Sequence, residues 1–135
     1  MSKITFASLK LKPNDEVKTF VINDKTIEVK QYLPMEDKIN ILDIVMQQAD
    51  QATVMNTLAL DALFHLYIVY KYTNISFTDK QKEDPFALYD ILDQNNIINA
   101  VVSTIPEDEY KFLRDGLVEM TKEYMQYRNS ARAVV

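Results

Sequence analysis

The apolar residues of this chain change their spacing at Pro34, and this change constrains the fold more than any other feature of the sequence. Before Pro34, apolar and polar residues mostly alternate, which is typical of half-buried strands; after it, apolar residues recur every three or four positions, which is typical of amphipathic helices. We therefore expect an α+β fold, mostly α, in which an N-terminal arm and a β-hairpin pack on a bundle of about five helices.

The length of 135 residues suits one domain with a single core. A domain of this size buries about two-thirds of the surface that its unfolded chain exposes, so it needs neither a metal nor a disulfide to be stable. We expect the arm to span residues 1–15 and the single domain to span 16–135, divided into a hairpin at 16–33 and a helical bundle at 34–130.

The expected arm contains four large apolar residues, Ile4, Phe6, Leu9 and Leu11, which alternate with polar residues until a turn at 13–15. Two interpretations remain open at this point. The arm is either an edge strand of the domain's own small sheet or an extended segment that adds to the sheet of a neighbour.

Residues 16–33 show the clearest hairpin pattern in the chain. Alternating apolar residues flank a turn at Asn23, Asp24 and Lys25, which contains no glycine. Asn and Asp tolerate the left-handed backbone of a tight turn because their short side chains bond the local backbone. Since a lone hairpin is marginal in water, we expect one face of this hairpin to pack on the helices or on further strands.

Capping signals divide the rest of the chain into helices. Residues 78–81 and 104–107 have the spacing of capping boxes, and Asp84 followed by Pro85 is a typical helix start. We expect the second helix to be central, because apolar residues cover most of its circumference. The expected helices run from Pro34 to near Gln51, from about Thr53 to Tyr72, from Thr78, from Pro85 to Asn95, from Ile97 to Thr104, and from Glu107 onward.

Composition removes several kinds of functional site. The chain has one Gly, one His and no Cys, so we expect neither a phosphate-binding glycine loop nor a thiolate or multi-histidine metal centre. Paired carboxylates occur at expected helix starts, where capping and the helix dipole account for them. His65 lies on the most apolar helix, and we expect it to be partly buried and hydrogen-bonded. We therefore expect no catalytic residue, no metal, no cofactor and no enzymatic activity.

The single glycine, Gly116, falls inside the last helix, where a glycine costs roughly 1 kcal/mol relative to alanine. We expect a close helix crossing to compensate for this cost, with the central helix of residues 53–72 as the neighbour. A hinge in the last helix is the alternative.

The charge and hydropathy of the chain argue against two classes of partner. The net charge is -5, and such a chain repels a phosphate backbone unless basic residues cluster on one face, so we expect no nucleic-acid partner. The chain contains no apolar run of about 18 residues, so we expect no membrane partner.

The tyrosines and the two ends of the chain indicate protein contacts. Tyrosine is enriched at protein interfaces, because it supplies contact area at low entropy cost and keeps its hydroxyl in water. The last residues of the chain are mostly apolar and must dock either on their own domain or on a partner. The expected partner-binding residues are Ile4, Phe6, Leu9, Leu11, Tyr124, Tyr127, Arg128 and Val135.

Several stretches of the chain carry a resemblance to a known family. They are IEVKQYLP at 27–34, the run from YTNI at 72–75 through TDKQKEDP at 78–85 to LYD at 88–90, IPEDEY at 105–110 and YRNS at 127–130. Over about residues 25–132 the chain resembles a family of small proteins encoded in the structural modules of tailed bacteriophages of low-GC Gram-positive hosts. A hairpin followed by a helical bundle is also similar to the layout of tail assembly chaperones.

The resemblance implies a non-enzymatic virion structural or morphogenesis protein that acts by protein–protein contacts in the tail or the head–tail connecting region. Its expected partners are other phage structural proteins or further copies of itself, and its expected location is the virion, or the host cytoplasm during assembly. A second hypothesis is a small acidic phage inhibitor that binds a host protein through carboxylates such as Glu36, Asp79 and Glu83. A third is an enzyme that uses His65.

Overall fold

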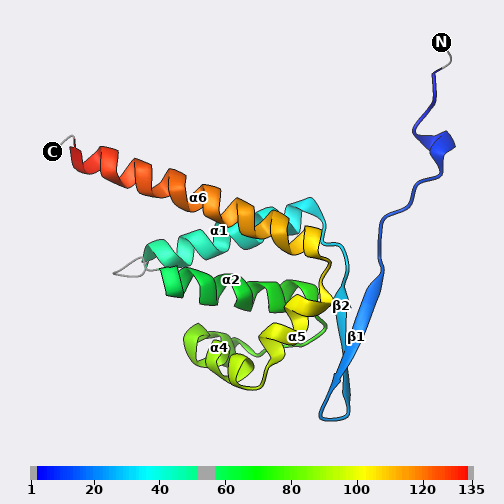
Figure 1. Ribbon diagram of the computed structural model, residues 1–135, viewed down its shortest axis with the longest axis horizontal. Helices are drawn as coiled ribbons and strands as arrows, with labels where there is room; N and C mark the ends of the chain where they lie inside the picture. The colour runs from blue at the N-terminus through cyan, green and yellow to red at the C-terminus, as the bar shows by residue number, and fades with distance from the viewer. Residues whose placement is uncertain (1–2, 52–56, 134–135) are drawn as a thin grey trace.

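The computed structural model describes residues 3–51 and 57–133, with the backbone alone at 49–51 and 127–133. Within these residues a two-stranded antiparallel hairpin precedes six α-helices, which confirms the α+β, mostly α fold (Figure 1). In chain order the elements are η1 (Ala7–Leu9, a turn of 3-10 helix), β1 (Val17–Ile22), β2 (Lys25–Lys30), α1 (Met35–Gln51), α2 (Thr57–Tyr72), α3 (Asp79–Lys82), α4 (Pro85–Gln94), α5 (Ile97–Thr104) and α6 (Glu107–Ala133).

The hairpin forms as the sequence predicts. Strands β1 and β2 pair with Ile22 opposite Lys25, so Asn23 and Asp24 alone make the turn. Their φ angles are 49° and 63°, the left-handed values that this two-residue turn requires and that Asn and Asp tolerate. Val29 on β2 is fully buried and belongs to the hydrophobic core, so the hairpin is anchored on the helices through one face.

Helix α2 lies at the centre of the bundle, as expected. Figure 1 shows it between α1 and α6 on one side and α4 and α5 on the other. Neighbours on both sides explain why apolar residues occupy most of its circumference. Its buried residues are Leu60, Ala62, Leu63, Phe64, His65, Leu66, Ile68, Val69 and Tyr72.

Two of the three predicted capping signals are confirmed. The Thr78 side chain accepts a hydrogen bond from the Gln81 amide while the Gln81 side chain accepts one from the Thr78 amide, which is a complete capping box. Asp84 likewise accepts a hydrogen bond from the Ala87 amide at the start of α4.

The capping box predicted at residues 104–107 is wrong. Thr104 is the last residue of α5, and its hydroxyl donates a hydrogen bond of 2.7 Å to the carbonyl of Ala100. The side chain is therefore engaged with the preceding helix, because Ser and Thr hydroxyls readily bond the carbonyl four residues earlier. Helix α6 begins at Glu107 after Pro106, whose carbonyl accepts from the Tyr110 amide.

The arm is not an edge strand of the domain's own sheet, so that interpretation is corrected. The sheet contains only β1 and β2 among the described residues, and residues 7–9 form a 3-10 turn instead. The Ser8 hydroxyl donates to the Thr5 carbonyl at 2.7 Å, and the Ser8 amide donates to the Thr5 hydroxyl. Such local bonds compete with strand pairing, which explains why alternation alone misled the prediction.

Gly116 lies at a tight helix contact, as expected, but its neighbour is α1 and not the central helix. A Cβ atom at Gly116 would stand 2.9 Å from Cδ1 of Leu42, closer than the 3.5–4.0 Å or so at which two carbons attract best. The expected neighbour was wrong because α6 packs along α1 (Figure 1). Helix α6 continues as one element through Gly116.

Candidate interaction surfaces

The N-terminal arm lies in solvent along its described length. Every residue from 3 to 16 is exposed, and none contributes to the core. Its four large apolar side chains are 74% exposed at Ile4, 78% at Phe6, 51% at Leu9 and 66% at Leu11. Large apolar side chains that are gathered in one segment and left in water mark a binding surface more often than scattered ones do.

The 3-10 turn of the arm pairs two of these side chains. Phe6 precedes η1 and Leu9 ends it, and residues three apart eclipse one another in a 3-10 helix. Phe6 and Leu9 therefore form a small apolar knob, and Lys10 follows with a left-handed φ of 53° that turns the chain. We call these two residues the arm knob.

Of the predicted C-terminal contact residues, those that the structure describes lie far from the arm. Tyr124 is a partly buried residue of α6, whereas Tyr127 and Arg128 lie in α6 where the structure describes only the backbone. Val135 lies outside the described residues. Figure 1 shows the arm and the end of α6 at opposite ends of the molecule, so the structure does not bring the two predicted contact regions together.

An apolar groove between α1 and α6 was not predicted from the sequence. Its volume is about 310 Å³. Three large side chains on its walls are about half exposed, at 47% for Met35, 52% for Ile39 and 48% for Phe112. Gly116 and Leu42 both line the groove, at the point where the missing side chain of Gly116 lets α6 approach α1 closely. We call it the α1–α6 groove; its lining residues are Met35, Lys38, Ile39, Leu42, Phe112, Asp115, Gly116 and Glu119.

A buried ion pair joins the two walls at one end of the groove. Lys38 Nζ on α1 donates to Glu109 Oε1 on α6 at 2.8 Å, and the two residues are only 4% and 8% exposed. The same ammonium lies 4.3 Å from the ring centre of Tyr32 and 5.2 Å from that of Phe112, within the range of a cation–π contact. This end of the groove is thus held by charge as well as by apolar packing.

Glu109 has two further partners, which makes it a junction of three elements. Its Oε2 atom accepts hydrogen bonds from the Leu33 amide at 3.2 Å and from the Tyr72 hydroxyl at 2.8 Å. Burial, and then the hydrogen bond to Glu109, raise the pKa of Tyr72 well above its usual value. Glu109 belongs to the first turn of α6, where capping and the helix dipole account for an acid, so its role in packing was not predicted from the sequence.

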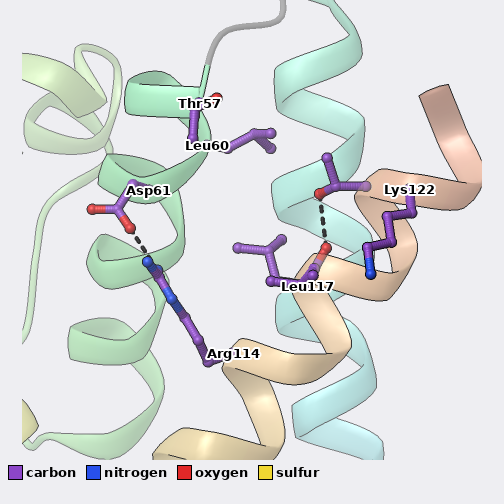
Figure 2. Close-up of a pocket in the computed structure, with 8 residues that line it drawn as sticks. Thr57, Leu60, Asp61, Arg114, Leu117 and Lys122 are labelled. Carbon is purple, nitrogen blue, oxygen red and sulfur yellow. Dashed lines mark hydrogen bonds and ion pairs between the residues drawn. The ribbon is translucent and has the colours of Figure 1, made fainter.

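A second, smaller cavity lies between the start of α2 and α6, with a volume of about 220 Å³ (Figure 2). Arg114 reaches from α6 to Asp61 on α2, and their Nη1 and Oδ1 atoms are 2.5 Å apart. This hydrogen bond raises the pKa of Arg114, so the guanidinium stays charged. The remaining lining is mostly apolar, from residues such as Leu60, Leu117 and Val118.

His65 is buried and hydrogen-bonded at both ring nitrogens, in agreement with the prediction. Its Nδ1 lies 2.8 Å from the carbonyl oxygen of Asp61, and its Nε2 lies 2.8 Å from the Tyr110 hydroxyl. A carbonyl can only accept, so Nδ1 carries the hydrogen and the Tyr110 hydroxyl donates to Nε2 in the neutral ring. Burial is the main cause that raises the pKa of Tyr110. This arrangement supports a structural role for His65.

The three carboxylates of the inhibitor hypothesis are all exposed but lie on different elements. Glu36 belongs to the first turn of α1, whereas Asp79 begins α3 and Glu83 follows the end of α3. Helix α3 packs on α4, on the other side of the bundle from α1. They do not form one acidic patch.

Within the described ranges, no group of three or more His, Asp or Glu residues could hold a metal ion. No helix in the same part of the chain is long and apolar enough to span a bilayer. No protein-family model, no curated protein and no solved structure matches the chain.

Proposed function

We propose that this protein is a non-enzymatic structural or morphogenesis protein of a tailed bacteriophage, which acts by protein–protein contacts in the tail or the head–tail connecting region. The proposal joins the sequence resemblance to one structural observation. That observation is the arm, which places Ile4, Phe6, Leu9 and Leu11 in solvent and leaves the domain's core complete without them.

The exposed side chains of the arm can release burial free energy when a partner covers them. Burying a large aliphatic or aromatic side chain contributes about 1.5–3 kcal/mol to stability. In the isolated chain, the four large apolar side chains of the arm are exposed and lack much of this stabilisation. A partner that covers the arm recovers it, less the entropy of ordering the segment. An exposed apolar arm is therefore better suited to binding than to stabilising its own domain.

The proposal is tested in a phage whose genome encodes this chain. Replacing Ile4, Phe6, Leu9 and Leu11 by serine keeps the length and charge of the arm and removes its apolar contacts. We expect loss of infectious particles, while thermal unfolding of the purified variant stays close to that of the parent protein. A control for a single change of the same kind is Ile91→Ser on α4, at a side chain that is 59% exposed, and we expect this variant to assemble normally.

The results of these experiments distinguish the proposed function from a structural role of the arm in the core and from the inhibitor hypothesis. Normal assembly with the serine arm would overturn the proposal, and a large loss of thermal stability would show that the arm belongs to the core. A band at 15.7 kDa in purified virions identifies a structural component, whereas absence from virions that nevertheless require the protein identifies a morphogenesis factor. Absence combined with assembly that does not require the protein favours the inhibitor hypothesis.

A further inference from the structure

The arm and the α1–α6 groove carry complementary chemistry. Between residues 3 and 14 the arm has three lysines and no acid, and its apolar side chains point into solvent. The groove combines half-exposed apolar walls with two exposed acids, Asp115 and Glu119, whereas its one lysine, Lys38, is buried in the ion pair with Glu109. A basic apolar segment therefore fits this groove in both charge and hydropathy.

Each of the two acids of the groove pairs with a lysine of α6, but both pairs are exposed. Asp115 lies 2.6 Å from Lys111 and Glu119 lies 3.5 Å from Lys122, but all four side chains are more than 60% exposed. Ion pairs exposed to this degree contribute little to stability, so an incoming lysine can replace or share the pairing at small cost.

We propose that the arm of one copy docks in the α1–α6 groove of a second copy of the same chain. The arm knob, Phe6 and Leu9, lies on the apolar lining, and Lys10 and Lys12 lie beside Asp115 and Glu119. The inference deepens the function proposed above, because it rests on the arm being a protein-binding segment and names the partner of that segment.

The structure favours docking of the arm in the groove of a second copy over docking in the groove of its own molecule. Figure 1 shows the arm leaving β1 in a direction that leads away from α1 and α6, and no described arm residue is buried on its own domain. Because arm and groove are different surfaces, the contact is head to tail. Such a contact generates a ring when its rotation closes and an open chain when it does not.

The absence of cysteine from the chain permits a clean cross-linking test on the full-length protein. A Phe6→Cys chain and an Ile39→Cys chain with different tags are mixed under mild oxidation. We expect a mixed disulfide at a yield at least several-fold above that of the control pair, Phe6→Cys with Ile91→Cys, whose second residue is 59% exposed on α4. Met35→Cys provides a second acceptor on the same groove in case Ile39→Cys folds poorly.

Two results would overturn the docking. One is a yield no higher than that of the control pair. The other is a disulfide that forms within a single chain of the Phe6→Cys, Ile39→Cys double variant at high dilution, because this would place the arm in its own groove.

Charge reversal tests the polar half of the contact. Lys10→Glu with Lys12→Glu on the arm should lower the yield several-fold, and added salt should do the same. Asp115→Lys with Glu119→Lys on the acceptor should restore it, whereas Lys18→Glu with Lys25→Glu on the hairpin should have no effect. Failure of this rescue would contradict the placement of the lysines.

The docking can fail while the proposed function stands. If serine substitution of the arm prevents phage assembly but no mixed disulfide forms, the arm binds another phage protein. If the disulfide forms but assembly does not require the arm, the chain self-associates and the proposed function is wrong.

Discussion

Lys38 Nζ on α1 lies 2.8 Å from Glu109 Oε1 on α6, and this buried pair connects the two helices that form the walls of the apolar groove. Glu109 also accepts hydrogen bonds from Leu33 and Tyr72, so one carboxylate of α6 contacts α1, α2 and the segment that joins β2 to α1. Burying a charged pair is favourable only when the remaining polar atoms of the pair also have hydrogen-bond partners. Here the second carboxylate oxygen of Glu109 has two such partners, the Leu33 amide and the Tyr72 hydroxyl.

Glu109→Ala should destabilise the protein by about 3–5 kcal/mol, because it leaves the ammonium of Lys38 buried without its partner. Urea unfolding measures this loss. The double variant Lys38→Met, Glu109→Leu should recover part of it, since no buried charge remains. Asp115→Ala is the control, because it breaks an exposed pair on the same helix and should leave the midpoint unchanged. Equal effects of Glu109→Ala and Asp115→Ala would contradict the assignment.

Gly116→Leu should destabilise the protein by about 1–3 kcal/mol through overpacking, although leucine is the better helix former. The new Cβ would stand 2.9 Å from Cδ1 of Leu42, so the contact between α1 and α6 must open. The cost should fall in a Leu42→Ala background, which removes that atom, and a double-mutant cycle in urea measures the coupling. Glu123→Leu, at an exposed site of α6, should be close to neutral. Additive effects of Gly116→Leu and Leu42→Ala would place the strain elsewhere.

The free energy of unfolding should decrease as the pH rises above about 10. Burial, and to a lesser extent Tyr67, raise the pKa of Tyr70 to about 12, and burial also raises the pKa of Tyr72. The unfolded chain releases these phenolic protons near pH 10.0, whereas the folded chain retains them, so deprotonation favours unfolding between the two values. Urea unfolding at a series of alkaline pH values measures the slope.

Tyr70→Phe and Tyr72→Phe provide the controls for the alkaline slope. Each removes one phenol whose pKa is raised in the folded state, so each should make the decrease in stability shallower. A slope that is the same in the parent protein and in both variants would show that other groups control the alkaline limit.

Asp24→Gly should stabilise the hairpin by up to about 1 kcal/mol. Asp24 has a φ of 63°, which a glycine adopts without steric cost, whereas this backbone conformation is sterically unfavourable for residues with a Cβ atom. Asp24→Val should have the opposite effect, because a β-branched side chain tolerates this backbone poorly. Thermal unfolding of the two variants beside the parent gives the sign, and stabilisation by valine would show that the turn has another geometry.

The features predicted correctly from the sequence are governed by short-range interactions. The turn at Asn23 and Asp24 and the caps at Thr78 and Asp84 involve groups within three residues of one another, so the local sequence contains all of their partners. The burial of His65 also followed from a local pattern, because its helix is apolar on nearly every side.

The features that were missed depend on long-range contacts. Glu109 bonds residues that are 37, 71 and 76 positions away, and a first-turn acid of this kind is normally solvent-exposed. The α1–α6 groove depends on which helix packs against Gly116, and apolar spacing alone pointed to the wrong one. In the arm, hydrogen bonds between Thr5 and Ser8 prevailed over the alternation that indicated a strand.

Local patterns specify the order and type of the main elements, because strand and helix periods, turn residues and caps act over a few positions. Three features arise instead from packing between distant segments: the contact of α6 with α1 at Gly116, the burial of Glu109 beside Lys38, and the groove between these two helices. Burial and helix packing depend on the shape of the whole core, in which residues far apart in the chain become neighbours, so short-range patterns do not contain them.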